Sequence, residues 1–317
     1  NQMVNQSTIA QFILKGFSDI PIVNAVCTGI FLIIYTFGIL GNISVITVII
    51  KDGHLHTPMY FFLKNLSFLD VCYVSVTMPK AIVNTILGSE EISFLECVVQ
   101  LYLFFTLAGT ECFLLTAMAY DRCMAIYRPL LYEITTNRKL CWELVSTSWI
   151  CGAFYAIFHA INTFSLPFCG PNVIDHFFCD IPTVMRLSCV DYHANEEWSF
   201  IYSSCIILGA FVLTIISYIC IISTIIKIQH VQGRWKAFST CSCHLTTIFL
   251  FYGTGSSMYL RPTSDYSPIQ GRLAAMFYSV ITPTLNPVIY CLRNKEIKVS
   301  LKKVFIKYRE KNEKRLS

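Results

Sequence analysis

The sequence predicts an all-α membrane protein, a bundle of seven transmembrane helices, on three observations. Hydrophobic residues make up 55% of the 317 residues and charged residues only 14%, with a mean hydropathy of +0.57. A soluble domain carries roughly 25% charged residues, so this chain has too little charge to coat a water-facing surface. The other two observations are seven long apolar stretches and an uneven distribution of Lys and Arg between their connections. A disordered chain is excluded because disorder needs low hydrophobicity and high charge.

Each apolar stretch reaches the roughly 20 residues that a helix needs to cross a bilayer. The stretches cover about 23–50, 58–86, 97–122, 139–163, 197–227, 237–261 and 272–292. Lys64, Asp70 and Lys80 lie within the second stretch, and Glu111 lies within the third. The stretches must be helical, because hydrocarbon offers no other partner for the N–H and C=O groups of an open chain. A transmembrane β-barrel would show shorter, alternating segments.

The Lys and Arg residues set the orientation of the bundle. Segments 1–22, 88–96, 164–196 and 262–270 contain only Lys15 and Arg186, and the alternate connections and the C-terminal segment contain most of the others. Cytoplasmic connections carry the excess of Lys and Arg. We therefore expect an extracellular N-terminal tail over 1–22, a seven-helix domain over 23–292 and a cytoplasmic tail over 293–317. In that tail Ile297, Leu301, Val304 and Phe305 share one helical face, which predicts an amphipathic helix on the inner membrane surface.

The start of the chain does not resemble a cleavable signal peptide, because its apolar stretch is too long and no positively charged segment precedes it. Asn5-Gln6-Ser7 is a glycosylation sequon on the predicted outer side. We therefore expect a glycan on Asn5.

Four cysteines lie on the outer side: Cys97, Cys169, Cys179 and Cys189. In an oxidising compartment they favour two disulfides, with three connectivities open. The alternative is a zinc site formed by Cys169, His176, Cys179 and Cys189.

The sequence contains no Walker loop, no nucleophile elbow and no zinc-protease motif, so we expect no enzyme. Asp70 and Glu111 lie near the middle of two spans, where an ionised carboxylate needs a partner. The two acids could share a proton, bind Na⁺ or belong to a structural hydrogen-bond network. Asp121-Arg122 at the cytoplasmic edge of the third span suits either a snorkelling arginine or an ion pair that opens on activation. Pro287 should kink the seventh span.

The motifs, taken in order, resemble those of the odorant (olfactory) receptors among the rhodopsin-like G-protein-coupled receptors. They are Gly41-Asn42, Leu55-His56-Thr57-Pro58-Met59-Tyr60, Leu66-Ser67-Phe68-Leu69-Asp70, Met118-Ala119-Tyr120-Asp121-Arg122, Ser217-Tyr218, Lys236-Ala237-Phe238-Ser239-Thr240-Cys241, His244-Leu245, Pro283-Thr284-Leu285-Asn286-Pro287, Ile289-Tyr290 and Leu292-Arg293-Asn294. The resemblance covers nearly the whole chain. Four residues depart from the family pattern on the cytoplasmic side and put coupling efficiency in doubt: Cys123, Tyr127, Arg128 and Cys243.

The resemblance implies a plasma-membrane receptor, in olfactory neuron cilia, for small volatile molecules. It implies a stimulatory, olfactory-type G protein that raises cyclic AMP. It also implies the disulfides Cys97–Cys179 and Cys169–Cys189, and a polar network of Asp70, Glu111 and Asn286, with Na⁺ as an optional allosteric ion and no other cofactor. The expected G-protein switch comprises Asp121, Arg122, Tyr218, His244, Asn286, Pro287 and Tyr290, with Asp121 holding Arg122 at rest.

We expect the ligand among spans 3, 5, 6 and 7, one to three turns below their outer ends. Pockets in helical bundles are mostly apolar with few polar groups. The candidate residues are Phe104, Phe105, Ala108, Gly109, Cys112, Tyr202, Ser203, Ile206, Tyr252, Tyr259, Met276 and Ser279. None is Lys, Arg or His, so we expect a neutral, largely apolar ligand.

Two other readings remain open from the sequence. A related receptor for a small lipid or amine is compatible with the acidic outer loops. A transporter or channel would need a polar path and usually carries internal repeats, and neither feature is evident.

Overall fold

The computed structural model describes residues 10–15, 21–169, 171–259, 268–294, 296–304 and 306. Asn5 and Phe305 lie outside the described residues, as does the side chain of Tyr259.

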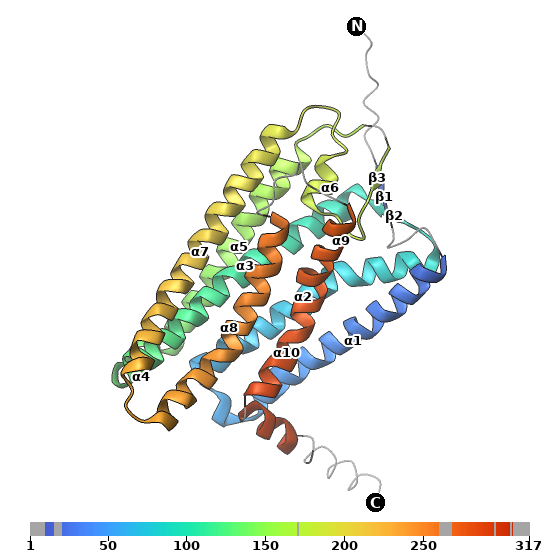
Figure 1. Ribbon diagram of the computed structural model, residues 1–317. Coiled ribbons are helices and arrows are strands. Elements are labelled where there is room, and N and C mark those ends of the chain that lie inside the picture. Colours follow the sequence, from blue (N-terminus) through green and yellow to red (C-terminus); the bar gives the residue numbers. More distant parts are fainter. Residues whose placement is uncertain are drawn as a thin grey trace, which may run out of the picture.

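Long helices lie side by side in a single bundle (Figure 1). They are α1 (Pro21–Lys51), α2 (Pro58–Leu87), α3 (Phe94–Tyr127), α5 (Arg138–Phe164), α7 (His193–Lys227) and α8 (Val231–Tyr259). The seventh span is built from α9 (Pro268–Met276), the π-helical turn η3 (Phe277–Ile281) and α10 (Thr282–Arg293). Short elements connect the long ones: η1 (Gly53–Leu55), α4 (Pro129–Thr135) and α6 (Ile181–Met185).

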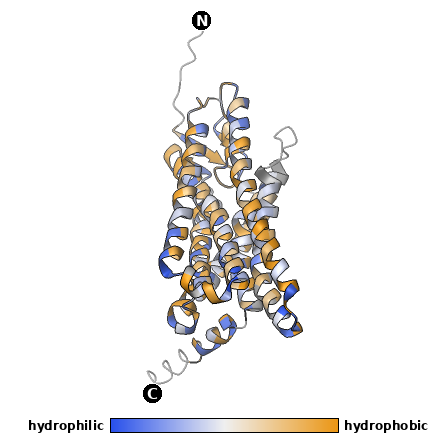
Figure 2. Ribbon diagram, turned by 90° about the vertical axis from the view of Figure 1, so that its left-hand side faces the viewer, coloured by the Kyte–Doolittle hydropathy of each residue, from blue (hydrophilic) through white to orange (hydrophobic). Residues whose placement is uncertain are grey.

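The outer surface of the bundle is apolar, as contact with lipid requires. Large side chains such as Ile33, Phe154 and Phe249 are well exposed there, and Figure 2 shows hydrophobic residues along the length of the helices. Within the described residues, six helices are long and apolar enough to cross a membrane: α1, α2, α3, α5, α7 and the seventh span from Gly271 to Cys291. The remaining helix, α8, runs beside them in Figure 1 but is less apolar, because its 29 residues include many Ser and Thr and one His.

The seventh span is less regular than its sequence suggests. Pro287 lies inside α10, as expected for a kink, but a π-helical turn precedes that helix. The Thr282 hydroxyl donates to the Phe277 carbonyl 3.0 Å away, which satisfies one backbone acceptor of the widened turn. After Asn294, residues 296–304 are helical, with Ile297 fully buried and Leu301 and Val304 packed against the core. This segment agrees with the predicted amphipathic helix.

A small sheet and two disulfides cover the outer end of the bundle. The strands β1 (Gln11–Leu14), β2 (Glu91–Ser93) and β3 (Val173–Ile174) pair in the order β2-β1-β3. The disulfides Cys97–Cys179 and Cys169–Cys189 confirm the pairing that the family resemblance implies. They also make the zinc alternative wrong, because the thiolates it needs are consumed in the two bonds.

Small residues bring neighbouring helices close together. A Cβ at Gly152 of α5 would lie 2.7 Å from the Thr110 backbone nitrogen of α3, so only glycine fits this crossing. Gly38 and Gly41 of α1 face Thr284 and Pro287 of α10 in the same way. Close approach through small residues is a common mode of packing in membranes, where lipid is as apolar as the helix surface.

Candidate ligand and transducer sites

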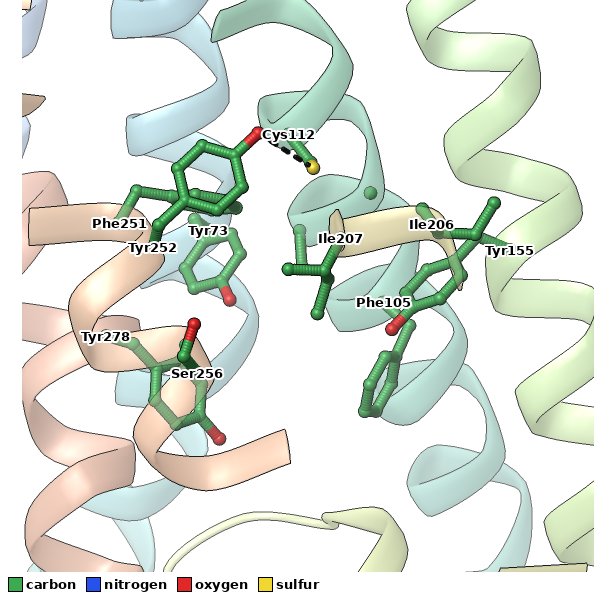
Figure 3. Close-up of a pocket in the computed structure, with 13 residues that line it drawn as sticks. Tyr73, Phe105, Cys112, Tyr155, Ile206, Ile207, Phe251, Tyr252, Ser256 and Tyr278 are labelled. Carbon is green, nitrogen blue, oxygen red and sulfur yellow. Dashed lines mark hydrogen bonds between the residues drawn. The ribbon is translucent and has the colours of Figure 1, made fainter. Parts of the chain in front are cut away.

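An apolar cavity of about 50 Å³ lies inside the outer half of the bundle. Figure 3 shows side chains from several helices converging on it. Its lining consists of Tyr73 from α2, Phe105, Ala108, Gly109 and Cys112 from α3, Tyr155 from α5, Ile206 and Ile207 from α7, Phe251, Tyr252, Gly255 and Ser256 from α8, and Tyr278 from η3. A hydrogen bond of 3.5 Å joins two of these residues, between the Cys112 thiol and the Tyr252 hydroxyl.

The lining offers hydroxyl and thiol groups but no formal charge. Among the residues that the structure describes, none in the lining is Lys, Arg, His, Asp or Glu. A charged ligand that entered this cavity would lose its hydration and would find no oppositely charged side chain. Transfer of an unpaired charge into an apolar site is strongly unfavourable. The cavity therefore suits a neutral molecule that makes one or two hydrogen bonds.

The cavity brings together six of the residues expected from the sequence: Phe105, Ala108, Gly109, Cys112, Ile206 and Tyr252. The other described candidates have different neighbours. Phe104 is fully buried and packs against Tyr73, Phe178 and Tyr278, and Met276 packs beside α1 and α2. Ser279 donates to the Ala275 carbonyl of its own helix.

Tyr202 and Ser203 belong to a polar aromatic cluster beside the cavity. The Ser203 hydroxyl is hydrogen-bonded to the Tyr155 hydroxyl at 2.9 Å and to Nε2 of His159 at 3.1 Å. The Tyr202 ring stacks on Tyr155 and packs against Phe158. Through Tyr155, this cluster fixes one wall of the cavity.

Seven lining residues were not among the candidates predicted from the sequence: Tyr73, Tyr155, Ile207, Phe251, Gly255, Ser256 and Tyr278. Helical spacing could have found Gly255 and Ser256, which lie three and four residues beyond Tyr252. Tyr73 and Tyr155 come from spans 2 and 4, and only the tertiary packing brings them to this cavity.

Two buried acids and an asparagine meet in the middle of the bundle. The Asn286 side-chain amide donates to both carboxylate oxygens of Asp70, at 3.0 and 3.1 Å. Glu111 is 3% exposed, and its Oε1 has no hydrogen-bond partner among the described residues. Oδ1 of Asn286 is likewise unpartnered within the described part of the chain. These carboxylate and amide oxygens are the ligand type that a hard cation such as Na⁺ prefers.

At the cytoplasmic end of α3, Asp121 has a different partner from the one expected. Its carboxylate accepts a hydrogen bond of 2.7 Å from the hydroxyl of Tyr132 in α4. Within the described residues, no ion pair of 4 Å or less joins Asp121 to Arg122. Consecutive helical residues point about 100° apart, so the carboxylate turns to α4 and Arg122 turns elsewhere.

Arg122 lies near Tyr218 of α7 and His244 of α8, and also near Tyr60 of α2. The Tyr218 hydroxyl is hydrogen-bonded to Nδ1 of His244 at 2.8 Å, which joins α7 to α8. The Tyr290 hydroxyl is hydrogen-bonded to Thr247 at 3.2 Å, which joins α10 to α8. Of the expected switch residues, Tyr218, His244 and Tyr290 thus meet at α8. Asp121 is bonded to α4, Pro287 faces Gly41 of α1, and Asn286 is bonded to Asp70.

The four departures from the family pattern lie around this region. Cys123 neighbours Cys220 of α7, and the Arg128 guanidinium lies 5.4 Å from the Tyr127 ring centroid. Cys243 is buried in the core. None of the four replaces a residue of the Tyr218–His244 or Tyr290–Thr247 links.

Comparison with known proteins agrees with this arrangement. The family model described as "Olfactory receptor" matches residues 31–308. The chain is 45% identical over 307 residues to olfactory receptor 5AP2 of Mus musculus, covering 97% of each chain. It is 45% identical over 304 residues to olfactory receptor 5AP2 of Homo sapiens, covering 96% of each chain. It is 44% identical over 304 residues to olfactory receptor 8U3 of Mus musculus, covering 96% of this chain and 95% of that one.

These sequence identities are higher than a shared fold alone produces. The aligned residues include both the cavity and the expected switch residues at the cytoplasmic end. They exclude an enzyme and a transporter. The chain is a multi-pass membrane protein and belongs to the olfactory receptor family, a family of G-protein-coupled receptors.

Proposed function

We propose that the chain binds small, neutral, volatile molecules in the cavity around Cys112 and Tyr252 and, in response, activates a stimulatory olfactory-type G protein that raises cyclic AMP. The uncharged lining carries this proposal, because it excludes the ion partner that an amine ligand would need. The same observation argues against the amine-receptor alternative. Residence in olfactory neuron cilia and a glycan on Asn5 belong to the same proposal.

Ligand binding requires the cavity to expand. The cavity of about 50 Å³ is smaller than the roughly 150 Å³ apolar cavity that is known to bind benzene, so a typical odorant needs more room. An agonist therefore selects an arrangement in which side chains or helices have moved apart. Phe251 and Tyr252 lie on α8, whose cytoplasmic half carries His244 and Thr247, so displacement of this helix would reach the G-protein face.

Asp70, Glu111 and Asn286 support this switching by neutralising the centre of the bundle. A shared proton would neutralise the acids, and so would Na⁺ held by the unpartnered Glu111 and Asn286 oxygens. Bound Na⁺ would supply positive charge that stabilises one helix arrangement. A sodium titration of basal cyclic AMP, replacing NaCl with choline chloride, separates the two alternatives: only the ion predicts a dependence on Na⁺ that Glu111→Gln abolishes.

The proposed ligand site is tested by filling it. Cells expressing the chain with an olfactory G protein are screened for cyclic AMP against neutral odorants and charged amines and acids. Ile206→Phe adds volume inside the cavity and should abolish responses to the active odorants. Ile216→Phe, on the lipid-facing side of the same helix and 57% exposed, is the matched control and should respond normally. Equal responses from both variants, or activation by charged compounds alone, would contradict the proposal.

A further inference from the structure

A second cavity, of about 630 Å³, opens at the cytoplasmic end of the bundle between α2 and α5. The last turn of α1, the η1 loop and the first turns of α2 and α5 line it. It is separate from the odorant cavity and from the switch residues on α7 and α8. Its deepest residue on α2, Lys64, lies about 10 Å along the helix from Thr57 at a rise of 1.5 Å per residue. The mouth of the cavity, at His56, Thr57 and Pro58, therefore lies at the cytoplasmic boundary of the second span, where lipid headgroups are found.

Two cations face this cavity without a carboxylate partner. Neither Lys64 nor Arg138 forms an ion pair with any residue that the structure describes. The Lys64 ammonium lies 5.3 Å from the Phe61 ring centroid, which positions it beside the cavity. The nearby carboxylate of Asp52 is engaged elsewhere, since it accepts hydrogen bonds from Ser300 and from the His54 backbone.

Helix dipoles add to the positive potential. Both α2 and α5 begin at this cavity, at Pro58 and Arg138. The Asn137 side chain already caps α5 by accepting a 2.9 Å hydrogen bond from the Leu140 N–H, so the N-terminus of α2 is the one without a side-chain cap. The Thr57 hydroxyl makes no capping hydrogen bond, which leaves it available to a ligand. Helix N-termini favour anions because their first N–H groups are unsatisfied and the dipole is positive there.

A buried hydroxyl provides an independent sign of a ligand. Thr136 lines the cavity and is 5% exposed, yet its Oγ1 has no hydrogen-bond partner among the described residues. An unpaired buried hydroxyl lowers stability by about 1–3 kcal/mol, so such groups usually have a partner. A phosphate oxygen in the cavity would supply one once the Thr136 side chain rotates towards it, because Oγ1 itself is buried.

We propose that this cavity binds the headgroup of an anionic phospholipid from the cytoplasmic leaflet. Lys64 and Arg138 contact its phosphate oxygens, and the Thr136 hydroxyl donates a hydrogen bond. The acyl chains lie against the apolar wall that includes Ile50 and Phe61. A zwitterionic headgroup fits less well, because its ammonium group would face two unpaired cations. Basic pockets between transmembrane helices on the cytoplasmic side are suited to such headgroups.

The test measures lipid binding to the purified full-length receptor. Native mass spectrometry follows titration with dioctanoyl phosphatidylinositol bisphosphate, and dioctanoyl phosphatidylcholine serves as the zwitterionic comparison. At about 1 kcal/mol for each cation, Lys64→Gln with Arg138→Gln should weaken binding of the anionic lipid roughly 30-fold. Lys227→Gln with Arg234→Gln removes the same charges from α7 and α8 and should leave binding within about twofold. Equal losses in both double variants would overturn the proposal, as would equal binding of the two lipids by the unsubstituted chain.

A milder variant distinguishes a ligand contact from a structural role. Thr136→Val keeps the side-chain volume and removes the unpaired hydroxyl, so thermal stability without lipid should rise slightly. Affinity for the anionic lipid should nevertheless fall several-fold, because one hydrogen bond to phosphate is lost. If lipid affinity stays unchanged or rises together with stability, Thr136 makes no contact with the headgroup and the proposed site is wrong.

Discussion

Cys112 and Tyr252 both line the odorant cavity, and a weak hydrogen bond of 3.5 Å joins their side chains. A thiol is a poor acceptor and donor, so an odorant oxygen can replace it as the partner of the tyrosine hydroxyl at little cost. The recognition chemistry thus rests on one or two hydroxyl groups in an otherwise apolar lining.

Replacing Tyr252 with Phe should therefore affect ligands selectively. Odorants with a hydrogen-bonding oxygen should lose about 2- to 10-fold in potency, the equivalent of one hydrogen bond, and hydrocarbon ligands should keep theirs. Cyclic AMP dose–response curves measure both. Tyr202→Phe is the control, because Tyr202 packs beside the cavity and does not line it. Equal potency shifts for both ligand classes would show that the hydroxyl acts on the fold.

Asp121 depends on Tyr132 for its hydrogen bond, so Tyr132→Phe should release the cytoplasmic end of α3 from α4. Burial and the neighbouring Asp121 raise the pKa of Tyr132, which keeps the phenol protonated and able to donate at every physiological pH. Loss of about 1 kcal/mol from the resting arrangement should raise basal cyclic AMP roughly fivefold. Tyr127→Phe keeps the ring beside Arg128 and should leave the basal signal unchanged. A normal basal signal from Tyr132→Phe would assign Asp121 another restraint.

Among the elements, the spanning helices could be predicted from the sequence and the irregular segments could not. Apolar length alone predicts a span, because an open chain in hydrocarbon must be helical. The strand Gln11–Leu14 pairs with residues about 80 and 160 positions away, and no local pattern encodes such pairing. The π-helical turn at Phe277–Ile281 also depends on its neighbours in the bundle. Tyr73 and Tyr155 were missed at the ligand cavity for the same reason.

The crossing of α3 and α5 makes a sharp prediction at the element scale. Gly152→Ala should lower thermal stability by about 1–3 kcal/mol, because the new methyl group meets the α3 backbone near Thr110. A Cβ at Gly209 of α7 would meet nothing within 4 Å, so Gly209→Ala is the matched control and should be neutral or slightly stabilising. Thermal denaturation of the two purified variants tests this. Similar midpoints would mean that the two helices are less tightly packed than described.

The extracellular cap should be sensitive to acid through His176. Burial, with the nearby Arg272 charge as a smaller cause, lowers the pKa of His176 to about 3. The unfolded chain takes up this proton below about pH 6.5, so stability falls as the pH decreases from about 6.5 towards 3. The loss at pH 5 is about 2 kcal/mol from this group. His176→Gln should therefore show a smaller drop in melting temperature between pH 7.5 and pH 5. Parallel drops in the two proteins would contradict a neutral buried histidine.

At the scale of the whole molecule, α8 is the element that joins the ligand cavity to the cytoplasmic face. Tyr252 lines the cavity, Thr247 holds Tyr290 of α10, and His244 holds Tyr218 of α7. The three α8 residues lie at successive levels along the same helix, from its cytoplasmic side towards the cavity. A ligand that is too large for the cavity of about 50 Å³ binds an expanded arrangement of the helices better than the one in the structure. We therefore expect the two hydrogen bonds on α8 to belong to the resting receptor and to break or exchange on activation.

Tyr218→Phe separates these hydrogen bonds from ligand binding. It removes the 2.8 Å link to His244 and leaves the odorant cavity untouched, so the resting arrangement alone is destabilised. At about 1 kcal/mol, basal cyclic AMP should rise roughly fivefold, and agonist potency should increase because less of the binding free energy is needed for switching. Tyr120→Phe, at a partly exposed position near the same end of α3, should change neither quantity. A lower basal signal from Tyr218→Phe at normal surface expression would instead assign the Tyr218–His244 bond to the active arrangement.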